Sequence, residues 1–541
     1  MDSIRNSLRA HGRIFAANCA LFTLIPKTPE AKSMKDMRPI ACFTTVIQDN
    51  ILMAQELLRR YSRKQVSPKC AIQMDIQKAY DTLEWYAING QVTNMLTAKR
   101  GLRQGDPISP LLFVLVIEYM HRCLKNLEQR TEFKYHPRCK KLGITNVSFA
   151  DDVMLFTRGD KSSVHLILQE ISFAEGKIPF KYLGVPLDSK KLSAQYFRPL
   201  IDKIMARITH WSARLLSYAG RCQRINNTLF AISAYWMQVF YFPKKVIKQI
   251  EALCQNYLWS GTMMSKKAPI AWESVCLPKS AGGLNIISLQ VWNKAIMGKL
   301  LWNIHKKADK LWIRWLDIYF FKNQDVMQWQ VKQSSSWMVR KLCSLRDTMK
   351  NTPYWEQAEV SDKFKTSDMY KAIMGDVNHV EWKKMIVDNY ARPRTIFALW
   401  MTLKGRLPTK DRLCKFGILT ENRCCFCQGE ESIEHLFFAC DETKKIWKTV
   451  LEWLHIDRNP RGWKEESMWL ISETRKKGWK RKILKVAITE TIYEVWKGRN
   501  HMVFNQTMLD PHMKERIIEN IGIRCGLHRS LSIHIRENRV D

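Results

Sequence analysis

Two adjacent carboxylates, Asp151 and Asp152, interrupt an apolar run that extends from Val147 to Phe156. In a buried strand, two neighbouring negative charges repel each other and lose hydration, and a divalent cation is the usual compensating partner. The order of apolar residues, two acids and further apolar residues predicts a β-hairpin with the acids at its tip. The alternative is a solvated turn, because aspartate is common in turns.

A third acid, Asp75, follows a strand-like run that starts at Cys70. Phosphoryl transfer by two metal ions needs carboxylates from separate strands, which hold two cations about 4 Å apart. We therefore expect Asp75 and Asp151 to lie close in the fold, with Asp152 beside them. Their carboxylates should be within about 8 Å of each other.

A basic turn that contains glycine lies between these acids. Gly101, Gly105 and Pro107 form the turn, and Pro110 stands near the start of a strongly apolar helix. The three blocks resemble motifs A, B and C of reverse transcriptases, in the order that this family has. Their amino-acid sequences (QKAYD, KRGLRQGDPISPLLF and FADD) are similar to those of plant non-LTR (LINE-type) retrotransposon polymerases.

The resemblance implies an α+β fold with the fingers and palm of a right-hand polymerase, a helical thumb and connection region, and a small zinc-binding domain. It also implies an RNA-directed DNA polymerase that uses an RNA template, a DNA primer or target, and deoxynucleoside triphosphates. By this resemblance Asp75, Asp151 and Asp152 are the catalytic residues and bind two Mg²⁺ ions.

The resemblance assigns further roles within the polymerase region. The nucleotide-binding residues would be Tyr80, Gln104, Arg103, Lys27 and Arg38, and the primer grip would be Tyr182, Leu183 and Gly184. Tyr80 would pack under the sugar and exclude a 2′-hydroxyl; the alternative is an ordinary core tyrosine. Lys27 and Arg38 would lie near the incoming triphosphate; the alternative is a pair of solvated charges beside a sheet.

The polymerase region is shorter than the family pattern. Only nineteen positions, Thr82 to Arg100, separate the first motif from the second, and a palm needs about three helical turns and an extended pair there. Two similar joins follow Phe43 and Asp160, and the second lacks motif D with its lysine. These joins predict a decayed element or a gene model with sequence removed, and in either case an impaired polymerase.

A cysteine and histidine cluster near the C-terminus predicts one zinc site. Cys424 and Cys427 form a Cys-x2-Cys knuckle, and we expect His435 and Cys440 on the helix that follows. This donor set suits tetrahedral Zn²⁺, and Cys425 is a less well spaced substitute for Cys424. The segment resembles the zinc-binding domain of plant LINE-type reverse transcriptases; the alternative is four residues without a metal.

The net charge of +36, from 87 Lys and Arg against 51 Asp and Glu, predicts a polyanionic partner but cannot by itself separate DNA, RNA and anionic membrane. No apolar run approaches the roughly 20 residues of a membrane span, and the N-terminus has no secretory pattern. We therefore predict an intracellular protein that acts in the nucleus, without membrane association, and whose 15 cysteines are reduced thiols apart from the metal cluster.

The predicted organisation has four parts. Residues 1–187 form the shortened fingers and palm, 188–360 a helical thumb and connection region, 361–450 the zinc-binding domain, and 451–541 a basic helical tail. The many tryptophans of the second part are predicted to build its core rather than to stack on bases. Two functions remain open: an impaired reverse transcriptase, or an inactive remnant that binds nucleic acid through basic surfaces and the zinc module. The oligomeric state is left open.

Overall fold

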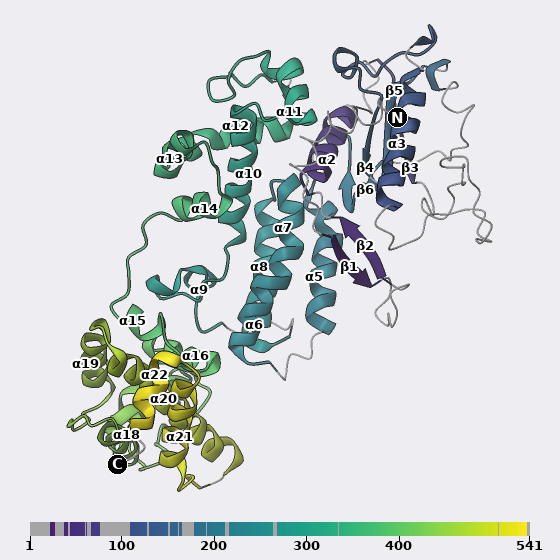
Figure 1. Ribbon diagram of the computed structural model, residues 1–541. Coiled ribbons are helices and arrows are strands. Elements are labelled where there is room, and N and C mark those ends of the chain that lie inside the picture. Colours follow the sequence, from purple (N-terminus) through teal and green to yellow (C-terminus); the bar gives the residue numbers. More distant parts are fainter. Residues whose placement is uncertain are drawn as a thin grey trace, which may run out of the picture. The chain divides into compact units, whose positions relative to one another are not determined.

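A computed structural model gives the fold of this chain (Figure 1). It describes residues 22–26, 37–41, 44–59, 61, 67–75, 109–126, 129–149, 152–160, 162–164, 178–190, 192–210, 216–262, 268–333, 335–506 and 508–537. The described residues form many helices and a few short strands, and the chain divides into two compact units. Unit 1 comprises Met1–Tyr196, Tyr235–Phe242 and Asn293–Met369, and unit 2 comprises Phe197–Ala234, Pro243–Trp292 and Tyr370–Asp541.

All described strands belong to unit 1. They are β1 (Phe22–Pro26), β2 (Met37–Ala41), β3 (Lys69–Asp75), β4 (Asn146–Phe149), β5 (Asp152–Arg158), β6 (Phe180–Tyr182) and β7 (Val185–Leu187). β1 pairs with β2 and β6 with β7, in each case antiparallel, and the central sheet has the order β3-β5-β4. Both pairings of the central sheet are antiparallel as well.

The central sheet forms because its middle strand is apolar throughout. Residues 153 to 156 of β5 are at most 2% exposed. On one face Val153 and Leu155 pack with Ile72 of β3 and with residues of helix α3 (Ser109–Asn126). Burying one such side chain stabilises the fold by about 1.5–3 kcal/mol. This core fixes the strand ends at which the acids stand.

The β-hairpin that the sequence predicted is confirmed. β4 and β5 are antiparallel neighbours, and Phe149 lies opposite Asp152. Asp152 is therefore the first residue of β5, and Asp151 lies outside the described residues. Helix α2 (Thr44–Leu58) is tied to this hairpin, because the side-chain amide of Asn50 donates to the Ser148 carbonyl at 2.8 Å.

The longer helices that follow are α5 (Arg198–His210), α7 (Phe230–Val239), α8 (Lys244–Ser260), α10 (Leu289–His305), α12 (Trp337–Lys350), α13 (Pro353–Ser361), α14 (Thr366–Met374), α16 (Pro393–Leu403), α18 (Asp441–Trp453), α19 (Trp463–Arg475), α20 (Trp479–Asn505), α21 (Met513–Gly526) and α22 (Arg529–Glu537). Shorter ones are α6 (Tyr218–Arg224), α9 (Trp272–Cys276), α11 (Leu311–Leu316), α15 (Lys383–Ile386) and α17 (Lys410–Lys415). Among the described helices, none combines the length and the apolar character that a bilayer crossing requires.

Tryptophans build much of the core in the helical part of unit 1. Trp312 and Trp315 are at most 1% exposed. Trp302 and Trp355 meet edge to face, with ring centroids 5.4 Å apart, and Phe364 packs beside them. The prediction that the tryptophans of this region are core residues is confirmed for these positions.

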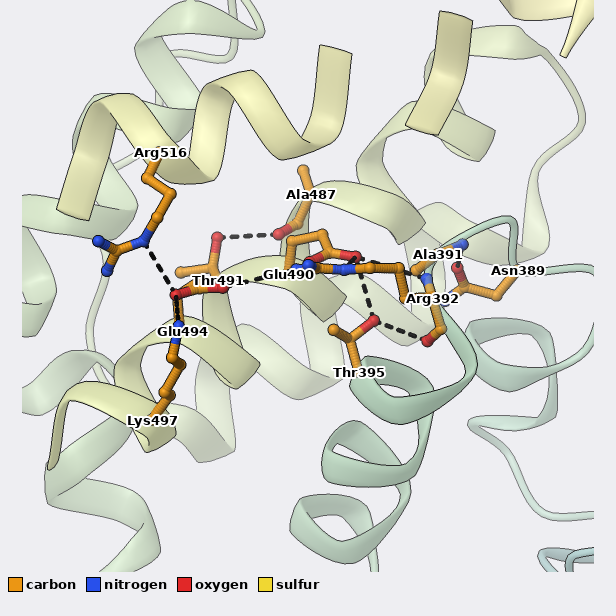
Figure 2. Close-up of polar contacts among 10 residues, drawn as sticks. All are labelled: Asn389, Ala391, Arg392, Thr395, Ala487, Glu490, Thr491, Glu494, Lys497 and Arg516. Carbon is orange, nitrogen blue, oxygen red and sulfur yellow. Dashed lines mark hydrogen bonds and ion pairs between the residues drawn. The ribbon is translucent and has the colours of Figure 1, made fainter. Parts of the chain in front are cut away.

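Helix α20 is the centre of the C-terminal part of unit 2. It packs against α16, α18, α19, α21 and α22, and even its acidic residues Glu490 and Glu494 are buried. Figure 2 shows how their charges are compensated: Arg392 binds Glu490, and Arg516 binds Glu494 with Nε and Oε2 3.2 Å apart. An unpaired buried carboxylate would be destabilising by several kcal/mol. These ion pairs therefore allow α20 to be buried along most of its length.

The boundary predicted at residue 450 falls inside α18. Residues 451–541, predicted as a basic tail, supply α20 and so share one core with residues 361–450. Sequence periodicity could not reveal this shared core. The buried acidic residues of α20 look like surface residues in the sequence, because the arginines that pair with them lie far along the chain.

Candidate functional site

The end of the central sheet brings two of the three predicted catalytic acids together. Asp75 is the last residue of β3, Asp152 is the first of β5, and the two are directly paired in the strand register. Directly opposed residues of an antiparallel pair have Cα atoms about 4.5–5.5 Å apart. Asp151 precedes Asp152 in the chain and lies outside the described residues. The predicted distance between the carboxylates of Asp75 and Asp151 is therefore still a prediction.

This arrangement suits a hard divalent cation. Carboxylate oxygens are the ligands that Mg²⁺ prefers, and it is commonly held by one or two carboxylates together with substrate phosphates. Asp152 is half-buried at the end of a strand whose next residue, Val153, is fully buried. Two carboxylates that lie close together repel each other, and a cation bound between them removes that repulsion.

Most of the predicted nucleotide-binding residues lie outside the described part of the chain. These are Lys27, Tyr80, Arg103 and Gln104. Arg38 lies in β2, opposite Ile25 of β1, and only its backbone is described. The structure therefore does not test whether these five side chains lie close together.

The predicted primer grip is a tight hairpin. Tyr182 ends β6 and pairs with Val185 of β7, and the two residues between them have positive φ angles, 48° for Leu183 and 77° for Gly184. Positive φ at both central positions defines a type I′ turn, which glycine adopts readily at its second position. The segment from Tyr182 to Val185 thus forms a β-hairpin with a two-residue loop.

A side chain from β3 and one from α7 hold this hairpin in place. The Gln73 side-chain amide donates to the Lys181 carbonyl at 3.1 Å, and Gln73 lies two residues before Asp75 on β3. The Tyr235 hydroxyl donates to the Leu183 carbonyl. Burial, and after it the charge of Asp152, raises the pKa of Tyr182, so that this tyrosine stays protonated beside the acid.

Sequence reasoning missed Gln73 and Tyr235. A polar residue in the apolar β3 run was a usable signal for Gln73. Tyr235 carries no such signal, because a tyrosine in an apolar helix is ordinary and its partner lies 52 residues away.

The predicted zinc ligands converge in unit 2. The donor atoms of Cys424, Cys427, His435 and Cys440 all lie within 4.8 Å of one another, and Cys427 Sγ is 3.0 Å from His435 Nε2. Tetrahedral coordination with zinc–sulfur bonds of about 2.3 Å separates the ligands by roughly 3.5–3.8 Å. The four side chains therefore fit Zn²⁺, and the group contains Cys424 rather than Cys425.

Backbone geometry shapes the zinc knuckle. The amide of Phe426 donates to Cys424 Sγ at 3.4 Å. A Cβ atom on Gly429 would lie 3.1 Å from His435 Cε1, so the close approach favours glycine there. The thiol contact with Cys424, together with burial, raises the pKa of Cys440 above its usual range, so metal binding would displace its proton.

His435 and Cys440 do not share one regular helix, which corrects the expectation for this pair. Phe437 and Phe438, which lie between them, have non-helical backbone angles, with φ of 81° at Phe438, and Cys440 is the N-cap residue of α18. The break turns the cysteine toward the histidine, because five residues of regular helix would point their side chains in different directions.

A buried ion pair supports the loop between the knuckle and His435. Glu431 is 0% and Arg499 is 1% exposed. The Arg499 guanidinium donates from Nε at 3.1 Å and from Nη2 at 2.7 Å to Glu431 Oε1. The same oxygen accepts the amide of Lys410 at the start of α17, at 2.8 Å. Arg499 of helix α20 thereby anchors the metal-binding loop through Glu431.

Comparisons with known proteins match both regions. Residues 23–177 match a family model described as "Reverse transcriptase (RNA-dependent DNA polymerase)". Residues 364–447 match a second family model, described as "zinc-binding in reverse transcriptase".

Three relatives show similarity over parts of the chain. A "Putative ribonuclease H protein" of Arabidopsis thaliana is 26% identical over 129 residues, or 24% of this chain and 21% of the relative. The retrovirus-related Pol polyprotein from the type-1 retrotransposable element R2 of Popillia japonica is 27% identical over 20% of this chain and 22% of its own length. An uncharacterized 149 kDa protein of transposon TX1 of Xenopus laevis is 23% identical over 50% of this chain and 27% of its own. The chain thus spans about a quarter of the length of these relatives.

Proposed function

We propose that this chain is a reverse transcriptase of the non-LTR retrotransposon type, to which its two matched regions are similar, and that it acts as an RNA-directed DNA polymerase with an impaired active site. The observation that carries the proposal is the strand register that sets Asp75 opposite Asp152. The substrates would be an RNA template, a DNA primer or target and deoxynucleoside triphosphates, and the protein would act in the nucleus, where its DNA target lies.

Asp75, Asp151 and Asp152 would hold two Mg²⁺ ions. When bound, such ions stabilise the charge that develops on the attacking and leaving oxygens. The carboxylates would fix the metal position relative to the sheet, because two of them stand on paired strands of a packed core. The attacking group would be the 3′-hydroxyl of the primer, and pyrophosphate would leave.

The other side chains would position the reactants. The Tyr182–Gly184 hairpin would seat the primer end, and its attachment to β3 through Gln73 would link primer position to Asp75. Tyr80 would pack under the sugar, and Gln104 would face the nucleotide and template. Basic side chains would contact phosphates; these are Lys27, Arg38 and Arg103.

We expect weak activity because the stretch from Thr82 to Arg100, which joins the first two motifs, is too short to position the catalytic and nucleotide-binding side chains accurately. A misplacement of about 1 Å can lower a rate on the order of 100-fold. The lysine of motif D, which would protonate the departing pyrophosphate, is also missing after Asp160. The competing function is an inactive remnant that binds nucleic acid, which the net charge of +36 favours.

Zn²⁺ would have a structural role in unit 2. The donor set has four protein ligands and leaves no open coordination position, which is typical of structural rather than catalytic zinc. One ion per chain is expected.

The test measures primer extension and nucleic-acid binding on one preparation of the full chain. Extension of an oligo(dT) primer on poly(rA) with Mg²⁺ is compared with that of the Asp151→Ala variant, and binding is followed as salt rises. Weak extension that the substitution abolishes supports the proposal. Extension that the substitution leaves unchanged contradicts it, and salt-sensitive binding without any extension favours the remnant.

A further inference from the structure

The connection between α19 and α20 in unit 2 is strongly basic. Six of the eight residues from 475 to 482 (RKKGWKRK) are lysine or arginine. α19 ends at Arg475 and α20 begins at Trp479, so that only three residues join the two helices. A Cβ atom on Gly478 would meet no atom within 4 Å, which shows that the turn faces open space.

One acid compensates part of this charge. Glu473 pairs with Lys476 at 2.5 Å and with Arg481 at 2.7 Å, and the hydrogen bond from Lys476 lowers its pKa. In the described part of the chain, Arg475, Lys477, Lys480 and Lys482 form no ion pair. Arg475, Lys477 and Lys480 are exposed, and Lys482 is half-buried with its ammonium 5.6 Å from the centre of the Tyr390 ring.

The positive charge extends to a neighbouring helix. α15, which carries exposed Lys384, packs against α19. Lys384 and Lys482 both lie close enough to Lys485 to lower its pKa, after the larger effect of burial; Asp388 opposes them. The first turn of α20 contains no acidic residue, so the positive end of the helix dipole adds to the same field.

We propose that this surface, the cationic turn (Lys384, Arg475, Lys477, Lys480 and Lys482), binds the phosphate backbone of nucleic acid. Like charges held close on a helical scaffold attract a polyanion strongly, because its phosphates replace the condensed counterions. The surface offers charges rather than a stacking platform, because Trp479 is half-buried and the Lys480 ammonium is 5.5 Å from the centre of its ring. The contacts are therefore with phosphates and independent of base sequence.

A membrane surface fits these residues less well. Peripheral membrane helices carry large apolar side chains beside their basic residues. Among the described residues, none of the exposed large apolar side chains falls between 473 and 485. The inference also lies outside the polymerase site, and it does not require that site to be active.

The first experiment removes four of these charges from the full chain. The Arg475→Gln, Lys477→Gln, Lys480→Gln, Lys482→Gln variant is compared with a matched control, Lys444→Gln, Lys445→Gln, Lys448→Gln, Lys464→Gln, in the same unit. Binding of a labelled single-stranded RNA is measured by fluorescence anisotropy at several salt concentrations. Each lost phosphate contact should reduce the slope of log affinity against log salt concentration by about 0.7. This slope should therefore fall by about 2 to 3 in the variant and change little in the control.

A second measurement uses the unmodified protein and so does not depend on folding of a variant. Bound RNA should protect Lys477, Lys480 and Lys482 from chemical acetylation, as read by mass spectrometry, and should leave Lys445 reactive. Equal salt slopes for variant and control, or unprotected lysines in the cationic turn, would overturn the proposal. Binding of anionic vesicles in place of RNA would overturn it as well.

Discussion

The buried pair Arg499–Glu431 gives the sharpest prediction about the zinc module. In Arg499→Met the guanidinium is lost while Glu431, 0% exposed, stays in place. Glu431 keeps the Lys410 amide but loses three charged hydrogen bonds, at 3.1, 3.2 and 2.7 Å. Breaking a buried ion pair from one side is destabilising by about 3–5 kcal/mol. Because one amide remains, we expect about 3 kcal/mol.

Zinc affinity should fall with stability, because Glu431 lies in the loop between Cys427 and His435. Loss of a group that supports metal ligands typically lowers affinity about 10–100-fold. The assays are urea unfolding of the full chain and zinc transfer to a chelating dye. The control is Arg461→Met, whose side chain is 73% exposed and whose loss should change stability by less than about 0.5 kcal/mol.

A double variant separates the ion pair from packing. Arg499→Met with Glu431→Gln removes both charges, and it should recover part of the lost stability because no unpaired charge stays buried. If Arg499→Met changed neither the unfolding free energy by more than about 1 kcal/mol nor the zinc affinity, the reasoning that α20 supports the metal loop would be refuted.

Three further predictions concern single side chains. Cys427→Ser should reduce bound zinc from one equivalent to none by elemental analysis, and unchanged zinc content would contradict the ligand assignment. Tyr235→Phe removes the hydroxyl that donates to the Leu183 carbonyl; it should weaken binding of a recessed primer end about 5-fold, roughly the net value of one hydrogen bond, and should leave binding of blunt duplex unchanged. Burial raises the pKa of Asp49 to about 6, only partly offset by Lys310. Because the folded state then binds the proton more tightly than the unfolded state, stability should fall as pH rises from about 4 to 6, by at most about 3 kcal/mol; Asp49→Asn should remove this fall in urea-unfolding measurements, and an unchanged pH profile would count against it.

The sequence predicted features that depend on neighbours along the chain. The order of apolar run, paired acids and apolar run around Asp152 predicted the hairpin, and the spacing of Cys424 and Cys427 predicted the knuckle, because both are local patterns. It could not predict partners across long separations: Gln73 meets Lys181, and Arg499 meets Glu431, 68 residues away. It also misjudged the C-terminal segment, because buried charges in α20 look like a solvated surface when their partners are unknown.

The central claim is that Asp75, Asp151 and Asp152 form one metal site. The most direct test is Mn²⁺ binding, followed by electron paramagnetic resonance, to the full chain with primer, template and a non-hydrolysable nucleotide. We predict a coupled pair of Mn²⁺ ions that Asp75→Asn and Asp152→Asn each abolish and that Asp362→Asn, at a 76% exposed side chain, leaves intact. An unchanged Mn²⁺ signal in Asp152→Asn would contradict the claim.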